Sequence, residues 1–391
     1  MPTTRDLAAA MQSIAPLELA ESWDNVGLLA GSWSRPLAGP VILTIDLTPA
    51  VATEALALKA SAIIAYHPPI FDPLTRLTDE CGTKQAALLH VIQSGIAVYC
   101  PHTALDAAAG GVTDWLADGL MDRKGIIKAD RRALSPDIRK RTTEELKIVT
   151  FVPADHEQRV RDGLASAGAG MVGNYTLCSF AMSGVGTFIG GEGSMPSVGV
   201  PGQLETVREV RLEMVCARRA LALAVETLRQ FHPYEEPSID VYELVGQPRR
   251  ALGAGRRLVL DQPATIEKLA DRLKSHLGIE KVQVARGIPC SSRPSMTPHA
   301  PNEASVVGIC PGAGSALVPL ALAEGCEVFV TGEMKHHEVL AATGEGLSVI
   351  LAGHTTTERG YLPNLAERLG ELLPGIKVIF SREDRNPLVL L

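Results

Sequence analysis

The sequence predicts an α/β protein: a core in two parts with parallel-rich sheets, interrupted by a smaller α+β domain. Two observations support this prediction. Short apolar runs alternate with helical stretches in residues 1–125 and again in 250–391, as in sheets covered by helices. Residues 146–247 instead follow the order strand, helix, strand, strand, helix, strand. A chain of 391 residues is also long for a single core, so several domains are expected.

The first part of the core carries three buried strands, each followed by a helix. The strands are predicted at 41–47, 61–66 and 96–100, and the helices at 4–15, 49–60, 83–93 and 111–120. The second strand must end at His67, because the two prolines that follow cannot donate to a ladder. In the turn at 21–29, Trp23 is expected to cover the core.

Residues 122–145 are rich in charge and poor in apolar side chains, which indicates an exposed connection. The α+β domain then has strands at 146–152, 207–215 and 240–244 and helices at 156–167 and 218–230. His232, Glu235 and Glu236 could bind a metal, but such a cluster more often bounds a loop, and we favour the loop.

The second part of the core returns to alternation. Helices are predicted at 265–277 and from about 362, and strands at 281–285, 306–310, 327–330, 347–352 and 378–381. Residues 288–302, rich in proline and serine, form a predicted loop. The stretch 311–315 lacks the third glycine of a dinucleotide fingerprint, so it predicts a tight turn.

Composition excludes several classes of protein. No run approaches the ~18 apolar residues of a membrane helix, and the N-terminus lacks the apolar core of a signal peptide. The net charge of −7 disfavours a general nucleic-acid binder. The seven cysteines include no Cys-x-x-Cys pair, which argues against a disulfide framework or a thiolate zinc site. A cytoplasmic location and free thiols are therefore expected.

Histidines and carboxylates follow four strands of the two core parts, at the point where each strand ends. They are Tyr66-His67, then His102 and Asp106, then Glu333 with His336 and His337, and finally His354 and Glu358. Open parallel sheets bind ligands beyond the carboxyl ends of their strands, so we expect these side chains to converge. Imidazole and carboxylate without thiolate suit Zn, Fe, Mn, Ni or Co, and the sequence does not choose among them.

Less specific interpretations stay open at single sites. Residues 355–357 could simply cap a helix, with Glu358 complementing its dipole. Cys100 could be a nucleophile, although a cysteine at a strand end is usually buried packing. The chain has no Gly-x-Ser-x-Gly elbow, no Walker loop and no His-Glu-x-x-His, so the corresponding hydrolases and metalloproteases are not indicated.

Five motifs together resemble one known family. They are Ser22-Trp-Asp-Asn-Val-Gly-Leu-Leu29, His67-Pro-Pro-Ile-Phe71, His102-Thr-Ala-Leu-Asp106, Thr331-Gly-Glu333 and Gly353-His354 with Glu358-Arg359. They are similar to the Nif-three-like dinuclear-metal family, also described as type 2 homologues of GTP cyclohydrolase I. The inner segment, with its glycine-rich stretch near 173–180 and His-Pro-Tyr-Glu-Glu at 232–236, resembles the PII/CutA-like insertion of some bacterial members.

The resemblance implies a toroidal homohexamer with two divalent metal ions in each subunit. By motif, the metal ligands carry over to His67, Asp106, His354 and Glu358. Many bacterial members have two adjacent histidines where this chain has Tyr66 and His67, whereas the Tyr-His-Pro-Pro form is similar to the eukaryotic branch. A phenol must lose a proton near pH 10 to bind a metal well, so a second site here would be weak or completed by water, His102 or His337.

The resemblance and the converging side chains lead to two functional hypotheses. The leading one is a dinuclear divalent-metal protein that acts as a hydrolase on a nucleotide or a phosphate-containing small molecule, with Glu333 or His337 as general acid or base. The cyclohydrolase label rests on resemblance alone. The alternative is a non-enzymatic regulatory or sensor protein whose insertion binds a small molecule. The sequence names no substrate, and it indicates neither a membrane nor a nucleic-acid partner.

Overall fold

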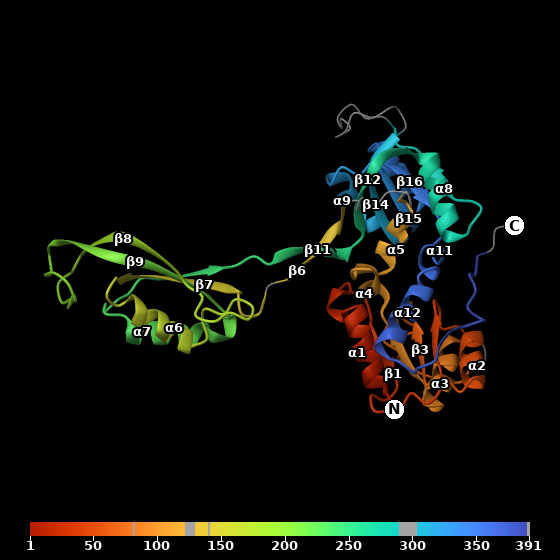
Figure 1. The fold of residues 1–391 in the computed structure, drawn as a ribbon, viewed down its shortest axis with the longest axis horizontal. Coiled ribbons are helices and arrows are strands. Elements are labelled where there is room, and N and C mark those ends of the chain that lie inside the picture. The colour runs from red at the N-terminus through yellow and green to blue at the C-terminus, as the bar shows by residue number, and fades with distance from the viewer. Residues whose placement is uncertain (81–82, 122–129, 140, 289–302, 389–391) are drawn as a thin grey trace. The chain divides into compact units, whose positions relative to one another are not determined.

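The structure is a computed structural model that describes residues 1–80, 83–121, 130–139, 141–288 and 303–388. The chain divides into two compact units, Met1–Asp137 with Arg249–Leu391, and Ile138–Pro248. We call the first the core and the second the middle unit. Strands β6 (Ser135–Arg139) and β11 (Gln247–Ala254) form a two-stranded sheet where the chain leaves and re-enters the core (Figure 1).

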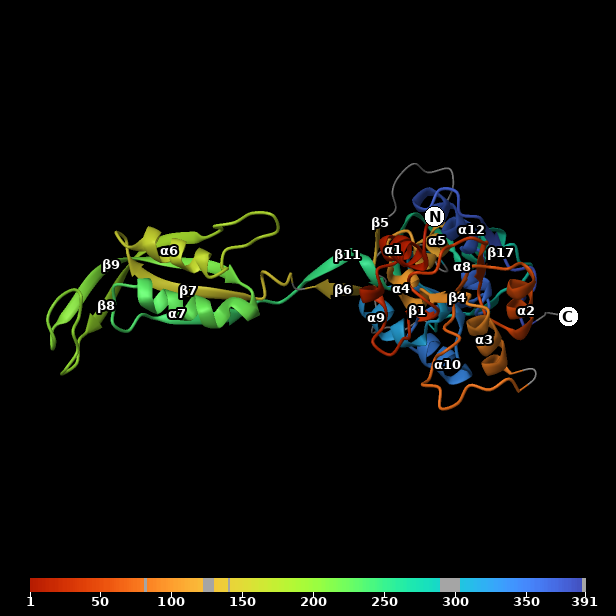
Figure 2. The ribbon, with the colours of Figure 1, turned by 90° about the horizontal axis from the view of Figure 1, so that it is seen from below.

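The first sheet of the core has five strands in the order β1-β4-β3-β2-β17. Their bounds are β1 Gly27–Ala30, β4 Ala97–Cys100, β3 Ala62–Ala65, β2 Val41–Thr44 and β17 Val378–Phe380. All are parallel except β1, which pairs antiparallel with β4 at one edge. Since β17 comes from the C-terminal end of the chain, the two outer segments build this sheet together (Figure 2).

Helices cover both faces of this sheet because successive strand residues point to opposite sides. Leu43, Ile64 and Tyr99 pack against α1 (Thr4–Ile14) and α12 (Leu362–Leu372). Their chain neighbours Ile42, Ile63 and Val98 pack on the other face against α2 (Pro49–Ala57) and α3 (Lys84–Gln93). Strands buried on both faces explain the continuous apolar runs in the sequence.

The second sheet has six strands in the order β13-β16-β15-β14-β12-β5. Their bounds are β13 Gln283–Ala285, β16 Ser348–Leu351, β15 Val328–Glu333, β14 Glu303–Ala313, β12 Arg256–Thr265 and β5 Asp130–Arg132. Only β14, β15 and β16 run parallel to one another. One face packs on α5 (Val112–Asp118) and α8 (Ile266–Leu277), the other on α9 (Val318–Ala323) and α10 (His336–Gly344). The fold is thus the predicted α/β core with parallel-containing sheets.

Parts of the local prediction were wrong. The expected connection at 122–145 contains β5 and β6, and β12 was not predicted at all. β5 pairs with β12 through backbone hydrogen bonds at the sheet edge, so it needs no apolar signature. β14 continues through the predicted turn as far as Ala313, and α4 (His102–Ala107) was missed. Of the loop predicted at 288–302, residues 289–302 lie outside the described part.

The middle unit has the predicted order of elements. These are β7 Leu146–Pro153, α6 Glu157–Ser166, β8 Phe180–Ile189, β9 Leu204–Cys216, α7 Leu221–Phe231 and β10 Ile239–Glu243. The strands form one antiparallel sheet in the order β10-β7-β9-β8, and both helices pack on it through a separate apolar cluster. Its likeness to a PII/CutA-like insertion stays a prediction.

His232 in the middle unit is a structural residue in this fold. Its Nδ1 accepts a hydrogen bond from the Tyr234 N–H at 3.1 Å, so its Nε2 carries the proton and donates to the Phe151 carbonyl at 3.0 Å. Both ring nitrogens are therefore engaged by the backbone. This agrees with the loop that we favoured over a metal cluster with Glu235 and Glu236.

The buried His232 predicts a pH-dependent stability of the middle unit. Burial lowers the pKa of this imidazole below its ordinary value, although the bond to Phe151 opposes the shift. Below about pH 6.5 the imidazole of His232 is therefore protonated in the unfolded chain more readily than in the folded unit. The free energy of unfolding decreases as the pH falls through that range. Hydrogen exchange of the β7 amides between pH 7.5 and 5.5 should show faster opening at low pH, and His232→Gln should reduce that dependence. An unchanged dependence in His232→Gln would contradict the assignment.

Among the helices in the described residues, none is long and apolar enough to cross a membrane.

Candidate metal centre

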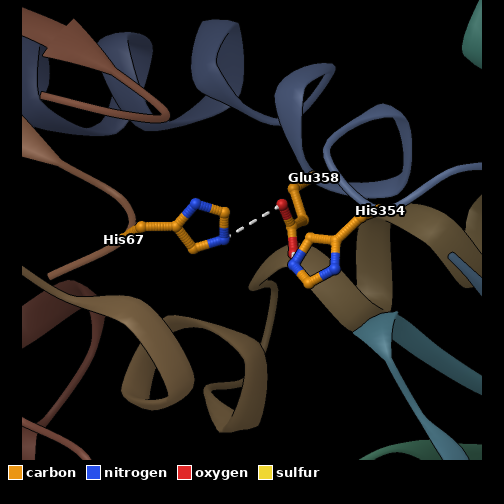
Figure 3. A group of neighbouring side chains, drawn as sticks. All are labelled: His67, His354 and Glu358. Atoms are coloured by element: carbon orange, nitrogen blue, oxygen red, sulfur yellow. Dashed lines mark ion pairs between the residues drawn. The ribbon is translucent and has the colours of Figure 1, made fainter. Parts of the chain in front are cut away.

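Three of the predicted metal ligands lie close together, where strands of the two core sheets end. His67 follows β3, His354 follows β16, and Glu358 lies in α11 (Thr356–Arg359). Figure 3 shows the imidazole of His67 on one side, with His354 and Glu358 facing it. One ligand atom from each residue lies within 4.8 Å of the other two, as a shared metal ion requires. The interpretation of Glu358 as only a helix-dipole partner does not account for this convergence.

Glu358 lies between the two imidazoles. Its Oε2 is 3.4 Å from Nε2 of His67, and its Oε1 is 3.4 Å from Nε2 of His354. The residue is only 3% exposed, and Oε2 accepts no hydrogen bond within the described residues. A Cβ at Gly312 would lie 2.6 Å from Oε1, so glycine is what lets β14 approach the carboxylate. A buried carboxylate with an unsatisfied oxygen is expected to have a cationic partner.

Each imidazole is oriented by a second carboxylate behind it. Nδ1 of His67 lies 3.1 Å from Oδ1 of Asp46, and Nδ1 of His354 lies 2.9 Å from Oε1 of Glu333. With the Nδ1 proton held in this way, Nε2 is the nitrogen left to bind a cation, which is the usual arrangement around metal-ligating histidines. Glu333 therefore orients His354 in this structure.

The carboxylates also affect protonation of the metal-free site. Burial lowers the pKa of His67, but the hydrogen bond to Asp46 and the nearby carboxylate of Glu358 outweigh it and raise the pKa to about 10. The hydrogen bond from His67 holds the pKa of Asp46 below its ordinary value. A metal must then displace a proton from His67, so metal uptake competes with protons.

A second group of predicted residues lies beside the three ligands. Asp106 in α4 accepts a hydrogen bond from the Tyr66 hydroxyl at 2.5 Å. Burial raises the pKa of Asp106 to about 7, although the bond from Tyr66 opposes the shift. The ring centroids of His102 and His67 lie 5.4 Å apart, and Nδ1 of His102 lies 2.8 Å from Oδ1 of Asp24. Asp106 and His102 are thus placed next to the centre.

His102 also carries backbone strain. Its φ is +25°, a conformation that residues other than glycine rarely adopt. Asp24 stabilises this conformation by accepting hydrogen bonds from the His102 ring and from the N–H and hydroxyl of Thr103. Strained residues of this kind concentrate at functional sites.

The remaining candidates lie elsewhere. His336 and His337 begin α10, where His337 is exposed, and neither is among the residues that line the cavity at the centre. Cys100 is fully buried, and its thiol donates to the Tyr66 carbonyl. Burial raises the pKa of this thiol well above its ordinary value, which favours packing over a nucleophilic role.

Sequence reasoning missed Asp46, although the same strand-end rule applies to it. It comes two residues after β2, but the predicted strand extended to residue 47 and so included it. Trp23 was also placed wrongly, because it is 58% exposed and lines the cavity at the centre. That cavity has a volume of about 650 Å³ and contains His67, His102, Asp106, His354 and Glu358 in its wall.

Known proteins resemble the chain along almost its full length. The family model Duf34/NIF3 (NGG1p interacting factor 3) matches residues 2–387. A protein of Halalkalibacterium halodurans called GTP cyclohydrolase 1 type 2 homolog is 33% identical over 360 residues, which is 92% of this chain and 90% of that protein. The bovine NIF3-like protein 1 is 31% identical over 385 residues, covering 98% and 91% of the two chains.

A solved structure matches the fold of the whole chain. The crystal structure of a Staphylococcus aureus protein is 26% identical, has a TM-score of 0.70, and covers 100% of this chain and 99% of its own. The match includes both core parts and the middle unit, so the interrupted α/β arrangement is shared. The chain belongs to the Duf34/NIF3 family.

Proposed function

We propose that this protein is a dinuclear divalent-metal protein that hydrolyses a nucleotide or another phosphate-containing small molecule. The observation that supports the proposal is the pair of imidazoles whose Nε2 atoms face a buried, unsatisfied Glu358 carboxylate. His67, His354 and Glu358 would hold one ion, and Asp106 would contribute to holding a second. The name of the Halalkalibacterium relative favours nucleotides as the first compounds to test.

The donor set fits a borderline first-row cation. Two nitrogens and carboxylate oxygens without sulfur suit Zn, Fe, Mn, Ni or Co. A divalent ion held here would supply Lewis acidity, polarising a phosphate oxygen and acidifying a water molecule. The residues themselves fix the geometry: Asp46 and Glu333 orient the two imidazoles, and Tyr66 orients Asp106 through its hydroxyl. Glu333 orients His354 through Oε1, and the role of Glu333 or His337 as general acid or base stays a prediction.

A panel assay tests the proposal. Purified protein would be stripped of metal, reloaded with zinc, manganese, iron, cobalt or nickel, and assayed on nucleotides and phosphoesters with elemental analysis in parallel. Metal-dependent steady turnover is the expected result. Firm metal binding with no turnover on any compound would favour the alternative, a regulatory protein in which the metals are structural or stored.

Tyr66 predicts the strength of a second metal site. Burial, with the nearby Asp106 carboxylate, raises the pKa of this phenol well above its ordinary value, so it acts as a neutral hydrogen-bond donor. We expect Tyr66→His to strengthen binding of the second ion without disturbing the first, because a neutral imidazole offers a lone pair at pH 7. Zinc titrations of the metal-free wild type and variant would measure this. Identical isotherms would mean that residue 66 does not face a metal, and Tyr66→Phe controls for loss of the hydroxyl.

We also propose the toroidal homohexamer that the family resemblance implies. Its expected mass is six times 41.5 kDa. Light scattering coupled to size exclusion would measure it, and a monomer at micromolar concentration would contradict the proposal.

A further inference from the structure

Two large aromatic side chains stand exposed at the metal-centre cavity. Trp23 is 58% exposed and Phe71 is 53% exposed, and both line the cavity. Their ring centroids lie 6.0 Å apart. Trp23 also meets the His102 ring edge-on at 6.1 Å, and His102 in turn neighbours His67. The exposed aromatic surface is therefore continuous with the ring cluster around the proposed ligands.

The two aromatics are held in place by hydrogen bonds on either side. Asp24, next to Trp23, accepts bonds from His102 and Thr103. The side-chain amide of Asn25 donates to the Ile70 carbonyl at 2.7 Å, which ties the turn of Trp23 to the turn of Phe71. Leaving fixed apolar surface in water is unfavourable unless a partner covers it, and exposed patches beside a cavity mark ligand sites.

The charge of the cavity limits what that partner can be. Among the described residues that line it, none is lysine or arginine, whereas Glu21, Asp106 and Glu358 are carboxylic acids. Proteins that bind polyphosphates place lysine, arginine or a glycine-rich helix start around the charge. The glycine-rich stretch 311–314 does line this cavity, but the N–H groups of Gly312 and Gly314 already donate to the hydroxyls of Thr357 and Thr331. Here the only strong positive charge available would be the metal ions, and they can balance one phosphate group far better than three.

We propose that Trp23 and Phe71 form a stacking platform for the substrate, and that the substrate is a planar aromatic heterocycle carrying at most one phosphate group. This inference rests on the proposed function, because it places the reacting group at the metal centre. A cavity of about 650 Å³ is of the size that holds a nucleoside monophosphate. Every ring has a face to stack, so the platform selects planarity and not one particular base.

The test measures binding to the zinc-loaded protein by calorimetry with three probes: guanosine 5′-monophosphate, ribose 5-phosphate and GTP. The wild type should bind the monophosphate more tightly than ribose 5-phosphate, and GTP no more tightly than the monophosphate. Trp23→Ala should weaken binding of the monophosphate roughly 10- to 100-fold, as expected for loss of base stacking, and leave ribose 5-phosphate unchanged. Trp23→Phe should restore most of the loss.

Trp33 provides a matched control. It is 45% exposed, packs against Arg5 and does not line the cavity, so Trp33→Ala should bind all three probes as the wild type does. Equal weakening of ribose 5-phosphate in Trp23→Ala, or tighter binding of GTP than of the monophosphate, would overturn the inference. So would a Trp23→Ala protein that changes its mass in solution and keeps full affinity, because Trp23 would then be covered by another subunit.

Zinc content separates this inference from the proposed function. Trp23 is not a proposed ligand, so elemental analysis should find the same zinc in Trp23→Ala as in the wild type. Wild-type protein that holds zinc but does not prefer the heterocycle would disprove the stacking platform alone. Wild-type protein that holds no zinc would disprove the metal centre itself.

Discussion

Replacing Glu358 by alanine is expected to remove most of the bound metal. Its two oxygens each lie 3.4 Å from an imidazole Nε2, so one substitution takes away the group that joins His67 to His354. Loss of an outer partner of a metal ligand costs roughly 10- to 100-fold in affinity, and loss of a ligand itself should cost more than about 100-fold. Elemental analysis after gel filtration and a competition titration with a chelator would measure the change.

Two further variants make the Glu358 result specific. Glu358→Gln keeps the shape and removes the charge, so it should also lose metal. Glu333→Gln removes only the carboxylate behind His354, whose Nδ1 it meets at 2.9 Å, and should show the smaller 10- to 100-fold loss. Circular dichroism would confirm that each variant is folded. A fully metallated Glu358→Ala protein would show that the ligand assignment is wrong.

The sequence predicted the core of the site because its residues obey a topological rule. Parallel strands end at one edge, and His67 follows a strand that is apolar on both faces, so its position required no knowledge of side-chain contacts. His354 follows β16 in the same way. The rule also covers Asp46, just after β2, and Glu333, at the end of β15. It places residues at an edge but names no side-chain contact, so it could not pair Asp46 with the ring of His67 or Glu333 with the ring of His354.

The parts that escaped prediction are those fixed by distant partners. β17 joins β2 although more than 330 residues separate them, and no local pattern encodes that pairing. β12 begins with two arginines and carries a proline, so propensity alone argues against a strand. Trp23 was expected to be covered, because a large ring usually packs on the core. For β17 and β12, pairing with distant strands decided the structure, and local sequence preferences did not predict it.

The arginine that begins β12 predicts the largest loss of stability. Arg256 is 1% exposed, and its Nε donates to Oδ1 of Asp114 in α5 at 2.6 Å. Its two terminal nitrogens donate to five backbone carbonyls, those of Ala107, Ala108, Ala251, Gly253 and Gly255. The guanidinium group thus provides hydrogen bonds to carbonyls at the end of α4, in one outer segment, and to carbonyls just before β12, in the other.

Arg256→Met is expected to destabilise the core by about 3–5 kcal/mol. Methionine fills similar volume but leaves several buried carbonyls without their donor, and among the described residues it leaves the Asp114 carboxylate with only Arg131 and the Gly110 N–H. Arg257→Met is the matched control: that residue is half-buried and its Nε donates to one carbonyl, of Glu324, so its loss should cost only about 1 kcal/mol. All three tryptophans lie in the core, so urea unfolding followed by tryptophan fluorescence reports on this unit. Equal midpoints for the two variants would mean that Arg256 does not hold the outer segments together. Because α4 also carries His102 and Asp106, the metal-free Arg256→Met protein should further lose affinity for zinc before it unfolds.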